Sequence, residues 1–76
     1  MPCIDMVATG RKIHEMRCAA GMTIRDVQDA CGGITATAVC KWQKGQSMPS
    51  IDNLIVLAAI WHVKIDDIVV TKCAAE

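Results

Sequence analysis

The chain has no phenylalanine and no tyrosine among its 76 residues, and only two tryptophans and two prolines. Ile, Val, Leu, Met and Ala must therefore fill the core with the two Trp, and a hydrophobic fraction of 53% makes this possible. No apolar run approaches the ~20 residues that cross a bilayer, and the longest, residues 54–61, fits a buried helix. The N-terminus lacks the basic start and apolar stretch of a signal peptide. We expect one domain over residues 1–76, cytoplasmic and without a membrane partner.

The chain also lacks any Cys-x-x-Cys pair, although it contains five cysteines, at positions 3, 18, 31, 40 and 73. The odd count and the absence of a secretion signal favour reduced thiols that act as small apolar residues. His14 and Cys18 are spaced i,i+4 on a predicted helix, a spacing that zinc uses, but no second pair completes a four-ligand site. We expect no metal and no cofactor, and a cysteine-based redox or metal switch is a distant alternative.

Features of an active site are equally scarce. There is no nucleophile with a base at recognisable spacing, and the only adjacent carboxylates, Asp66 and Asp67, fit a helix start facing solvent. Gly32-Gly33 has no strand before it and fits a turn, not a nucleotide loop. The sequence predicts a protein that is not an enzyme.

Net charge is absent as well, since eight basic residues balance eight acidic ones. The distribution is uneven, however. Residues 1–45 carry six basic and four acidic residues, a charge of +2, whereas residues 46–76 carry two basic and four acidic residues, a charge of −2. A binder of nucleic acid with so modest a basic end would have moderate, salt-sensitive affinity.

Apolar periodicity and capping residues predict five helices. Their expected ranges are about 5–20, 23–31, 35–44, 50–61 and 65–70. Asp5, Thr23, Thr35 and Ser50 are the expected N-caps, and glycines follow the first three helices, while Gly10 weakens the first one. Residues 71–76 are expected to fray.

The inward faces follow from the same spacing. The residues expected to pack are Val7, Ile13, Met16 and Ala20 in the first helix, Val27 and Ala30 in the second, Val39 and Trp42 in the third, and Ile65, Ile68 and Val69 in the last. The helix over 50–61 is apolar around most of its circumference through Ile51, Leu54, Ile55, Leu57, Ala58 and Trp61, so we expect it to be the most buried element. Trp61 fits either the core or a dimer contact.

The stretch Thr23–Pro49 has the layout of a capped helix, a glycine turn and a second capped helix that ends at Gly45. Its run Val-Cys-Lys-Trp-Gln-Lys-Gly over 39–45, followed four residues later by Pro49, resembles the lambda-repressor-like, Cro/repressor-type helix-turn-helix regulators. The resemblance covers about residues 6–70. It implies an all-α, compact five-helix domain in which the helices over 23–31 and 35–44 form the helix-turn-helix that docks in the DNA major groove.

Four departures from the family pattern stand out. One extra residue separates the turn glycine from Val39, so the turn or the start of the third helix must be rearranged. Ile24 stands where many members carry a phosphate-binding Gln. Gln43 replaces a frequent Glu, so a hydrogen bond to Arg17 is expected in place of an ion pair. The exposed start of the third helix, residues 35–38, reads Thr-Ala-Thr-Ala and is poor in long polar side chains.

The resemblance implies that DNA is contacted by Thr23, Arg25, Thr35, Ala36, Thr37, Lys41, Lys44 and Gln46. Thr37 and Lys41 share a helix face: Thr37 is a candidate to contact thymine methyls, and Lys41 to donate to guanine or to a phosphate. Lys44, Gln46 and Arg25 are expected to grip phosphates. The plainer alternatives are that Thr35 is only a cap and that the other side chains are merely solvated.

Together these features predict a transcriptional regulator that binds double-stranded DNA and acts as a repressor. We expect it to bind a pseudo-palindromic operator as a homodimer and to be associated with the nucleoid when bound. Dimer contacts are expected from residues 65–70, and no small-molecule ligand is evident. The alternative is a protein-interaction or antitoxin-like adaptor of the same fold. Zero net charge, the Ala-rich helix start and the acidic C-terminal end favour that alternative.

Overall fold

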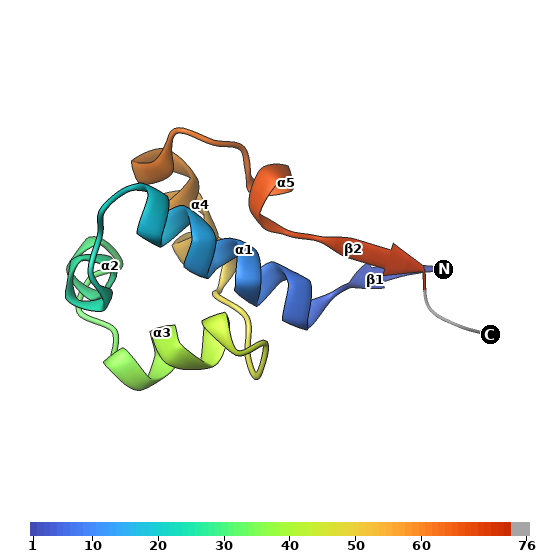
Figure 1. Ribbon diagram of the computed structural model, residues 1–76, viewed down its shortest axis with the longest axis horizontal. Helices are drawn as coiled ribbons and strands as arrows, with labels where there is room; N and C mark the ends of the chain where they lie inside the picture. The colour runs from blue at the N-terminus through green and yellow to red at the C-terminus, as the bar shows by residue number, and fades with distance from the viewer. Residues whose placement is uncertain (74–76) are drawn as a thin grey trace.

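The computed structural model describes residues 1–73, in which five helices pack around one core and a short two-stranded sheet closes the chain (Figure 1). The helices are α1 (Met6–Ala19), α2 (Ile24–Ala30), α3 (Ala36–Gln43), α4 (Ile51–Trp61) and α5 (Ile65–Ile68). The strands are β1 (Pro2–Ile4) and β2 (Thr71–Cys73). The five predicted helices are confirmed, and the predicted ranges of the first four exceed the observed ones mainly by the capping residues.

All four predicted N-caps are confirmed by side-chain hydrogen bonds. Asp5 Oδ1 accepts from the N–H of Ala8 at 3.0 Å, and Ser50 Oγ accepts from Asn53 at 3.2 Å. Thr23 and Thr35 hold the starts of α2 and α3 in the same way. Each cap satisfies one of the N–H groups that a helix start leaves without a partner.

The first four helices also end alike, with a left-handed residue just beyond the last turn and paired backbone bonds back into the helix. In three of them this residue is a glycine, as the sequence predicts. In α4 it is His62, with φ of 55°, and the N–H of Val63 donates to Ala58 O at 3.0 Å. A side chain in this conformation costs roughly 1 kcal/mol relative to glycine.

The core draws on every helix. Its buried apolar members are Ile13, Val27, Val39, Trp42, Leu54, Leu57, Trp61 and Ile68. Both tryptophans therefore belong to it, which settles Trp61 as a core residue. The N–H of its indole donates to Met22 Sδ at 3.3 Å, so the ring's single polar atom has a partner. Val7 and Ala20, expected to pack inward on α1, are instead exposed, because the core contact of α1 is centred on Ile13.

The helices α1 and α3 approach so closely that their backbones touch at Gly10. A Cβ at this position would overlap the carbonyl oxygen of Trp42 and lie 2.7 Å from that of Gln43. Gly10 therefore has a packing role that outweighs its low helix propensity. This contact fixes the distance between the two helices.

The end of the chain differs from the prediction. α5 stops at Ile68, not at residue 70, and residues 71–73 do not fray but form β2, which pairs antiparallel with β1. The β-branched run Val69-Val70-Thr71 favours extended backbone. The buried hydroxyl of Thr9 holds it there, accepting from the N–H of Val70 at 2.9 Å and donating to its carbonyl at 3.3 Å. Residues 74–76, also expected to fray, lie outside the described residues.

A second correction concerns α4. Leu54, Leu57 and Trp61 are buried as expected, but Ile51 is 67% exposed and Ile55 53% exposed. Positions 51, 55 and 59 lie one above the other on a helix, so α4 presents one apolar face to the core and another to solvent. No helix within residues 1–73 has the length and apolarity to cross a bilayer.

The backbone contact at Gly10 predicts the sign of a substitution. Gly10→Ala should lower the free energy of unfolding by about 2 kcal/mol, because the new methyl group must push α1 and α3 apart. Helix propensity alone would raise stability by ~1 kcal/mol. Urea unfolding followed by circular dichroism distinguishes the two, and a rise in stability would show that the helices do not touch here.

Candidate nucleic-acid interface

The helices α2 and α3 form the frame of the candidate interface, and α3 lies along one side of the molecule (Figure 1). The turn between them contains two successive glycines with positive φ, Gly32 at 82° and Gly33 at 89°. The side-chain amide of Gln28 donates to Ile34 O at 3.0 Å and closes the turn. The extra residue noted in the sequence is thus accommodated, and α3 still starts with Thr35 as its cap.

The two faces of α3 have opposite characters. Val39 and Trp42 are buried against α1 and α2. Thr37, Lys41 and Lys44, spaced i, i+4 and i+7, are exposed and lie on the opposite side of the helix. Because Val39 and Trp42 fix α3 against the core, the exposed residues Thr37, Lys41 and Lys44, called here the outward stripe Thr37-Lys41-Lys44, have a fixed position. The stripe begins with a hydroxyl group and ends with two ammonium groups.

The start of α3 is small and exposed. Thr35 Oγ1 accepts from the N–H of Ala38 at 3.1 Å, so the cap role predicted for this threonine is confirmed. The N–H groups of Ala36 and Thr37 belong to the first turn and have no partner within the helix. They lie at its positive end, where phosphate binds favourably. The alanine side chains leave room for another surface to approach this backbone.

The α2 residues are exposed but already engaged. Thr23 and Asp26 form a reciprocal capping box, in which Thr23 N donates to Asp26 Oδ2 at 2.8 Å and Thr23 Oγ1 accepts from Asp26 N at 3.1 Å. Asp26 therefore occupies the anion-binding end of α2, which leaves Thr23 little capacity for a phosphate. Arg25 makes a long, exposed ion pair with Asp29 at 3.4 Å, an interaction weak enough for a phosphate to replace.

The C-terminal end of α3 is closed by Gly45, whose φ is 74°. The N–H of Gln46 donates to Lys41 O at 2.9 Å, and that of Gly45 to Trp42 O at 3.1 Å. Lys44 and Gln46 flank this turn with exposed side chains. Both therefore leave the helix from a fixed backbone.

A polar clasp joins α1 to the end of α3. Arg17 Nε donates to Gln43 Oε1 at 2.9 Å, as the sequence predicts for the Gln that replaces Glu. Arg17 Nη1 also donates to Met22 O at 2.8 Å. His14 Nδ1 lies 3.1 Å from the same Gln43 oxygen, a contact that the sequence reasoning missed. Its only signal was the i,i+3 spacing of His14 and Arg17, which places both on one face of α1.

The eight residues predicted to contact DNA are all exposed and belong to α2, α3 and their flanking turns. Cys40, between the outward and buried faces of α3, is half-buried. Cys31, at the end of α2, is also half-buried, and burial raises the pKa of its thiol. Among residues 1–73, no three His, Cys, Asp or Glu side chains gather in a way that could hold a metal ion.

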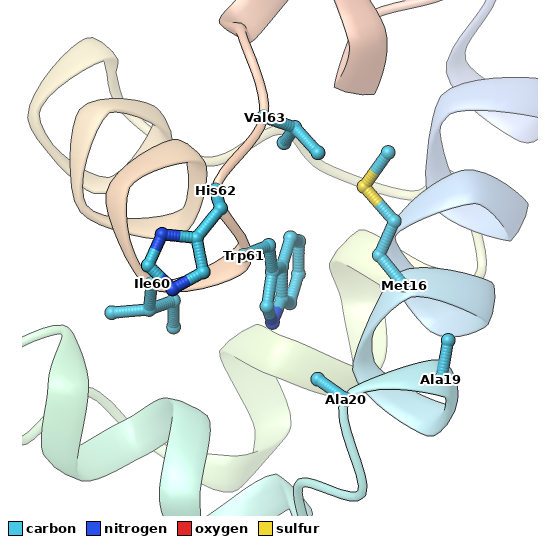
Figure 2. Close-up of a pocket in the computed structure, with 7 residues that line it drawn as sticks. All are labelled: Met16, Ala19, Ala20, Ile60, Trp61, His62 and Val63. Atoms are coloured by element: carbon cyan, nitrogen blue, oxygen red, sulfur yellow. The ribbon is translucent and has the colours of Figure 1, made fainter.

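An apolar pocket of about 390 Å³ lies outside this interface, where the C-terminal ends of α1 and α4 meet (Figure 2). The indole of Trp61 stands between Met16 and Ala20 on one side and His62 on the other. The lining residues are Met16, Ala19, Ala20, Ile60, Trp61, His62 and Val63. None of them belongs to α2 or α3, so the pocket and the candidate interface are separate.

Comparison with known proteins agrees with this geometry. A family model described as helix-turn-helix, of the Cro/C1 type, matches residues 13–68, from the middle of α1 to the end of α5. The crystal structure of the restriction-modification controller protein C.AhdI from Aeromonas hydrophila superposes with a TM-score of 0.73 and 23% identity, covering 84% of this chain and 96% of that chain. At this identity the likeness shows a shared fold. No curated protein sequence matches.

The pKa of Cys31 predicts an order of thiol reactivity. Because burial raises it, a smaller fraction of this thiol is ionised at pH 7–8, and the thiolate is the species that reacts. Iodoacetamide should alkylate Cys31 several-fold more slowly than the exposed Cys3 and Cys73, as measured by timed quenching and peptide mass spectrometry. The difference should vanish in 6–8 M urea, and equal rates in the folded protein would contradict the burial.

Proposed function

Because the chain belongs to the Cro/C1-type helix-turn-helix family of DNA-binding transcription regulators, we propose that it binds double-stranded DNA sequence-selectively and represses transcription. The observation that carries this proposal is the outward stripe Thr37-Lys41-Lys44, which lies opposite the buried Val39 and Trp42 of α3. Since the core holds α3 in place, the outward stripe is already positioned to enter the DNA major groove.

The start of α3 would meet base edges. Ala36 has only a methyl group, so the backbone can sit deep in the major groove. Thr37 offers a methyl group that suits the thymine methyl and a hydroxyl that suits a base edge, while Lys41 can donate to guanine O6 and N7. Short side chains give few such contacts, so we expect modest discrimination between sequences.

Phosphate contacts would come from both ends of the frame. Lys44 and Gln46 lie after the last turn of α3, and Arg25 can exchange its exposed pairing with Asp29 for a phosphate. Of the eight residues predicted to contact DNA, Thr23 is the weakest candidate, because its backbone N–H at the start of α2 already donates to the Asp26 carboxylate. With so few cations, overall affinity should be moderate, and the slope of log K against log salt should be small, about one for each phosphate contact.

Repression would follow from occlusion of promoter DNA by a bound dimer. The structural likeness to a restriction-modification controller protein, at 23% identity, supports the fold on which this proposal rests and not the role itself. We propose that the operator is pseudo-palindromic, with half-sites ~34 Å or a multiple of this apart.

The dimer contact is better placed on α4 than on residues 65–70. Ile68 is buried, and Ile65 and Val69 pack against the core, so these apolar side chains are used within the chain. Ile51 and Ile55, with Ala59 one turn further, form an exposed apolar stripe. A two-fold axis would bring the same stripe of a second copy against it, and each isoleucine would lose apolar surface to the partner.

The alternative function, a protein-interaction or antitoxin-like adaptor, draws on the same α4 stripe and on the zero net charge. The two functions differ in salt response. Titration against random duplex DNA at low salt should show binding that weakens with added salt. Absence of any such binding at micromolar protein would reject the regulator and favour the adaptor.

The two lysines of α3 should behave differently on DNA. Once a preferred sequence is selected from a random pool, Lys41→Ala should lose ~1–3 kcal/mol of discrimination against unselected duplex. Lys44→Ala should instead weaken all sequences alike and reduce the slope of log K against log salt by about one. Lys64→Ala, a surface lysine before α5, is the matched control and should change neither. Equal, sequence-blind losses at Lys41 and Lys44 would show that Lys41 only grips phosphate.

The α4 stripe can be tested independently of DNA. Ile55→Lys should weaken self-association at least tenfold, as measured by sedimentation equilibrium, because it places a charge in the apolar contact. Val7→Lys changes an equally exposed apolar residue, 59% exposed on α1, and should leave self-association intact. If both variants dimerise like the wild type, the dimer contact lies elsewhere.

A further inference from the structure

The exposed side of α1 carries a cysteine and a histidine in direct contact. Cys18 Sγ lies 3.7 Å from His14 Nε2, one helical turn away. The other ring nitrogen of the same histidine, Nδ1, lies 3.1 Å from Gln43 Oε1. One imidazole thus faces a thiol with one nitrogen and an amide oxygen of α3 with the other.

We propose that His14 and Cys18 form an open binding site for a divalent metal ion of the zinc class, coupled through His14 to the end of α3. Sulfur and imidazole nitrogen are the donors that zinc prefers. The ion would take the place of the thiol proton: a metal–sulfur bond forms, one proton leaves to solvent, and the lone pair of Nε2 completes the chelate.

The distance between the two donors fits this role. With metal–sulfur and metal–nitrogen bonds of about 2.3 Å and 2.0–2.1 Å, the 3.7 Å separation corresponds to a sulfur–metal–nitrogen angle of about 115°. This value is close to the tetrahedral angle. A linear two-coordinate ion would need about 4.3 Å between the same donors, so the geometry favours a tetrahedral ion with two positions left for water or another ligand.

The second ring nitrogen is placed to support the metal. An ion on Nε2 requires the remaining proton of the neutral imidazole to sit on Nδ1, from which it can donate to Gln43 Oε1. Metal-bound histidines are commonly oriented by such an acceptor. Arg17 Nη2, 3.3 Å from Nδ1, would lose an acceptor there, but Arg17 keeps its bonds to Gln43 Oε1 and Met22 O. Binding would therefore favour one histidine tautomer and strengthen the link between α1 and α3.

The site differs in kind from the four-ligand site that the cysteine spacings exclude. Both ligands, His14 and Cys18, come from α1, and Gln43 of α3 is the hydrogen-bond acceptor that supports the histidine. It also lies on α1, away from the outward stripe Thr37-Lys41-Lys44, so occupancy does not block a groove-facing side chain. The metal would act on α3 through Gln43, at the end of the helix.

Cobalt(II) is the probe of choice, because a cobalt–thiolate bond absorbs in the near ultraviolet and the visible bands report the coordination number. Titration of reduced wild-type protein should give a thiolate band that saturates at one ion per chain, and zinc should displace it. Cys18→Ser should abolish the band, and His14→Ala should weaken the affinity at least tenfold. Both residues are exposed, and circular dichroism checks that each variant folds.

The matched control is the double variant Cys3→Ser/Cys73→Ser, which removes two other exposed thiols and should keep the band. Survival of the band in Cys18→Ser, its loss in the control, or unchanged affinity in His14→Ala would each overturn the site. None of these measurements uses DNA, so failure here leaves the proposed regulator function standing.

The coupling to α3 has its own readout. Gln43→Leu removes the acceptor for Nδ1–H without touching either ligand, and loss of such an outer partner typically lowers metal affinity about 10–100-fold. Zinc should also raise the melting temperature of the wild type but not that of Cys18→Ser, because it binds the folded state. Unchanged cobalt affinity in Gln43→Leu would overturn the link to α3.

Discussion

The backbone contact between α1 and α3 is the constraint on which the rest of the structure depends. Because Gly10 has no side chain, the backbone carbonyl groups of Trp42 and Gln43 in α3 can contact the backbone of α1. The side chain of Trp42 is buried in the core at this fixed distance between the two helices. The clasp of Arg17 and Gln43 ties the same two helices at the protein surface. The position of the outward stripe on α3 is thus set by contacts that α3 makes with α1 and not by the stripe itself.

Local signals were enough to predict most of the helical framework. The caps Asp5, Thr23, Thr35 and Ser50 bond backbone groups three residues away, so their role is legible in a short stretch of sequence. The terminal sheet was not predictable in this way. Its strands have three residues each, and it depends on Thr9 meeting Val70, 61 positions along the chain. The exposed side of α4 was missed because apolar periodicity does not say which of two apolar faces the core covers.

The candidate interface shows the same division. The exposure of Lys41 and Lys44 followed from the helical period and from Val39 and Trp42 on the other side. The engagement of Thr23 by Asp26 was partly visible, since an acidic residue stood three positions after the cap, but its competition with phosphate emerged only from the capping-box geometry. The contact of His14 with Cys18 follows the i,i+4 spacing within α1, whereas its contact with Gln43 required the packing of α1 on α3, which no local pattern specifies.

The pairing of β1 with β2 joins the two ends of the described residues 1–73 through residues that are all exposed. Helical turns and neighbouring helices meet early, because short loops cost little entropy to close, whereas joining the two ends requires the whole chain to be in place. We therefore expect this two-stranded sheet to form last and, because its residues are exposed, to open first. Its amide hydrogens would exchange with solvent before those of α1 or α4, while the helix-turn-helix stays closed.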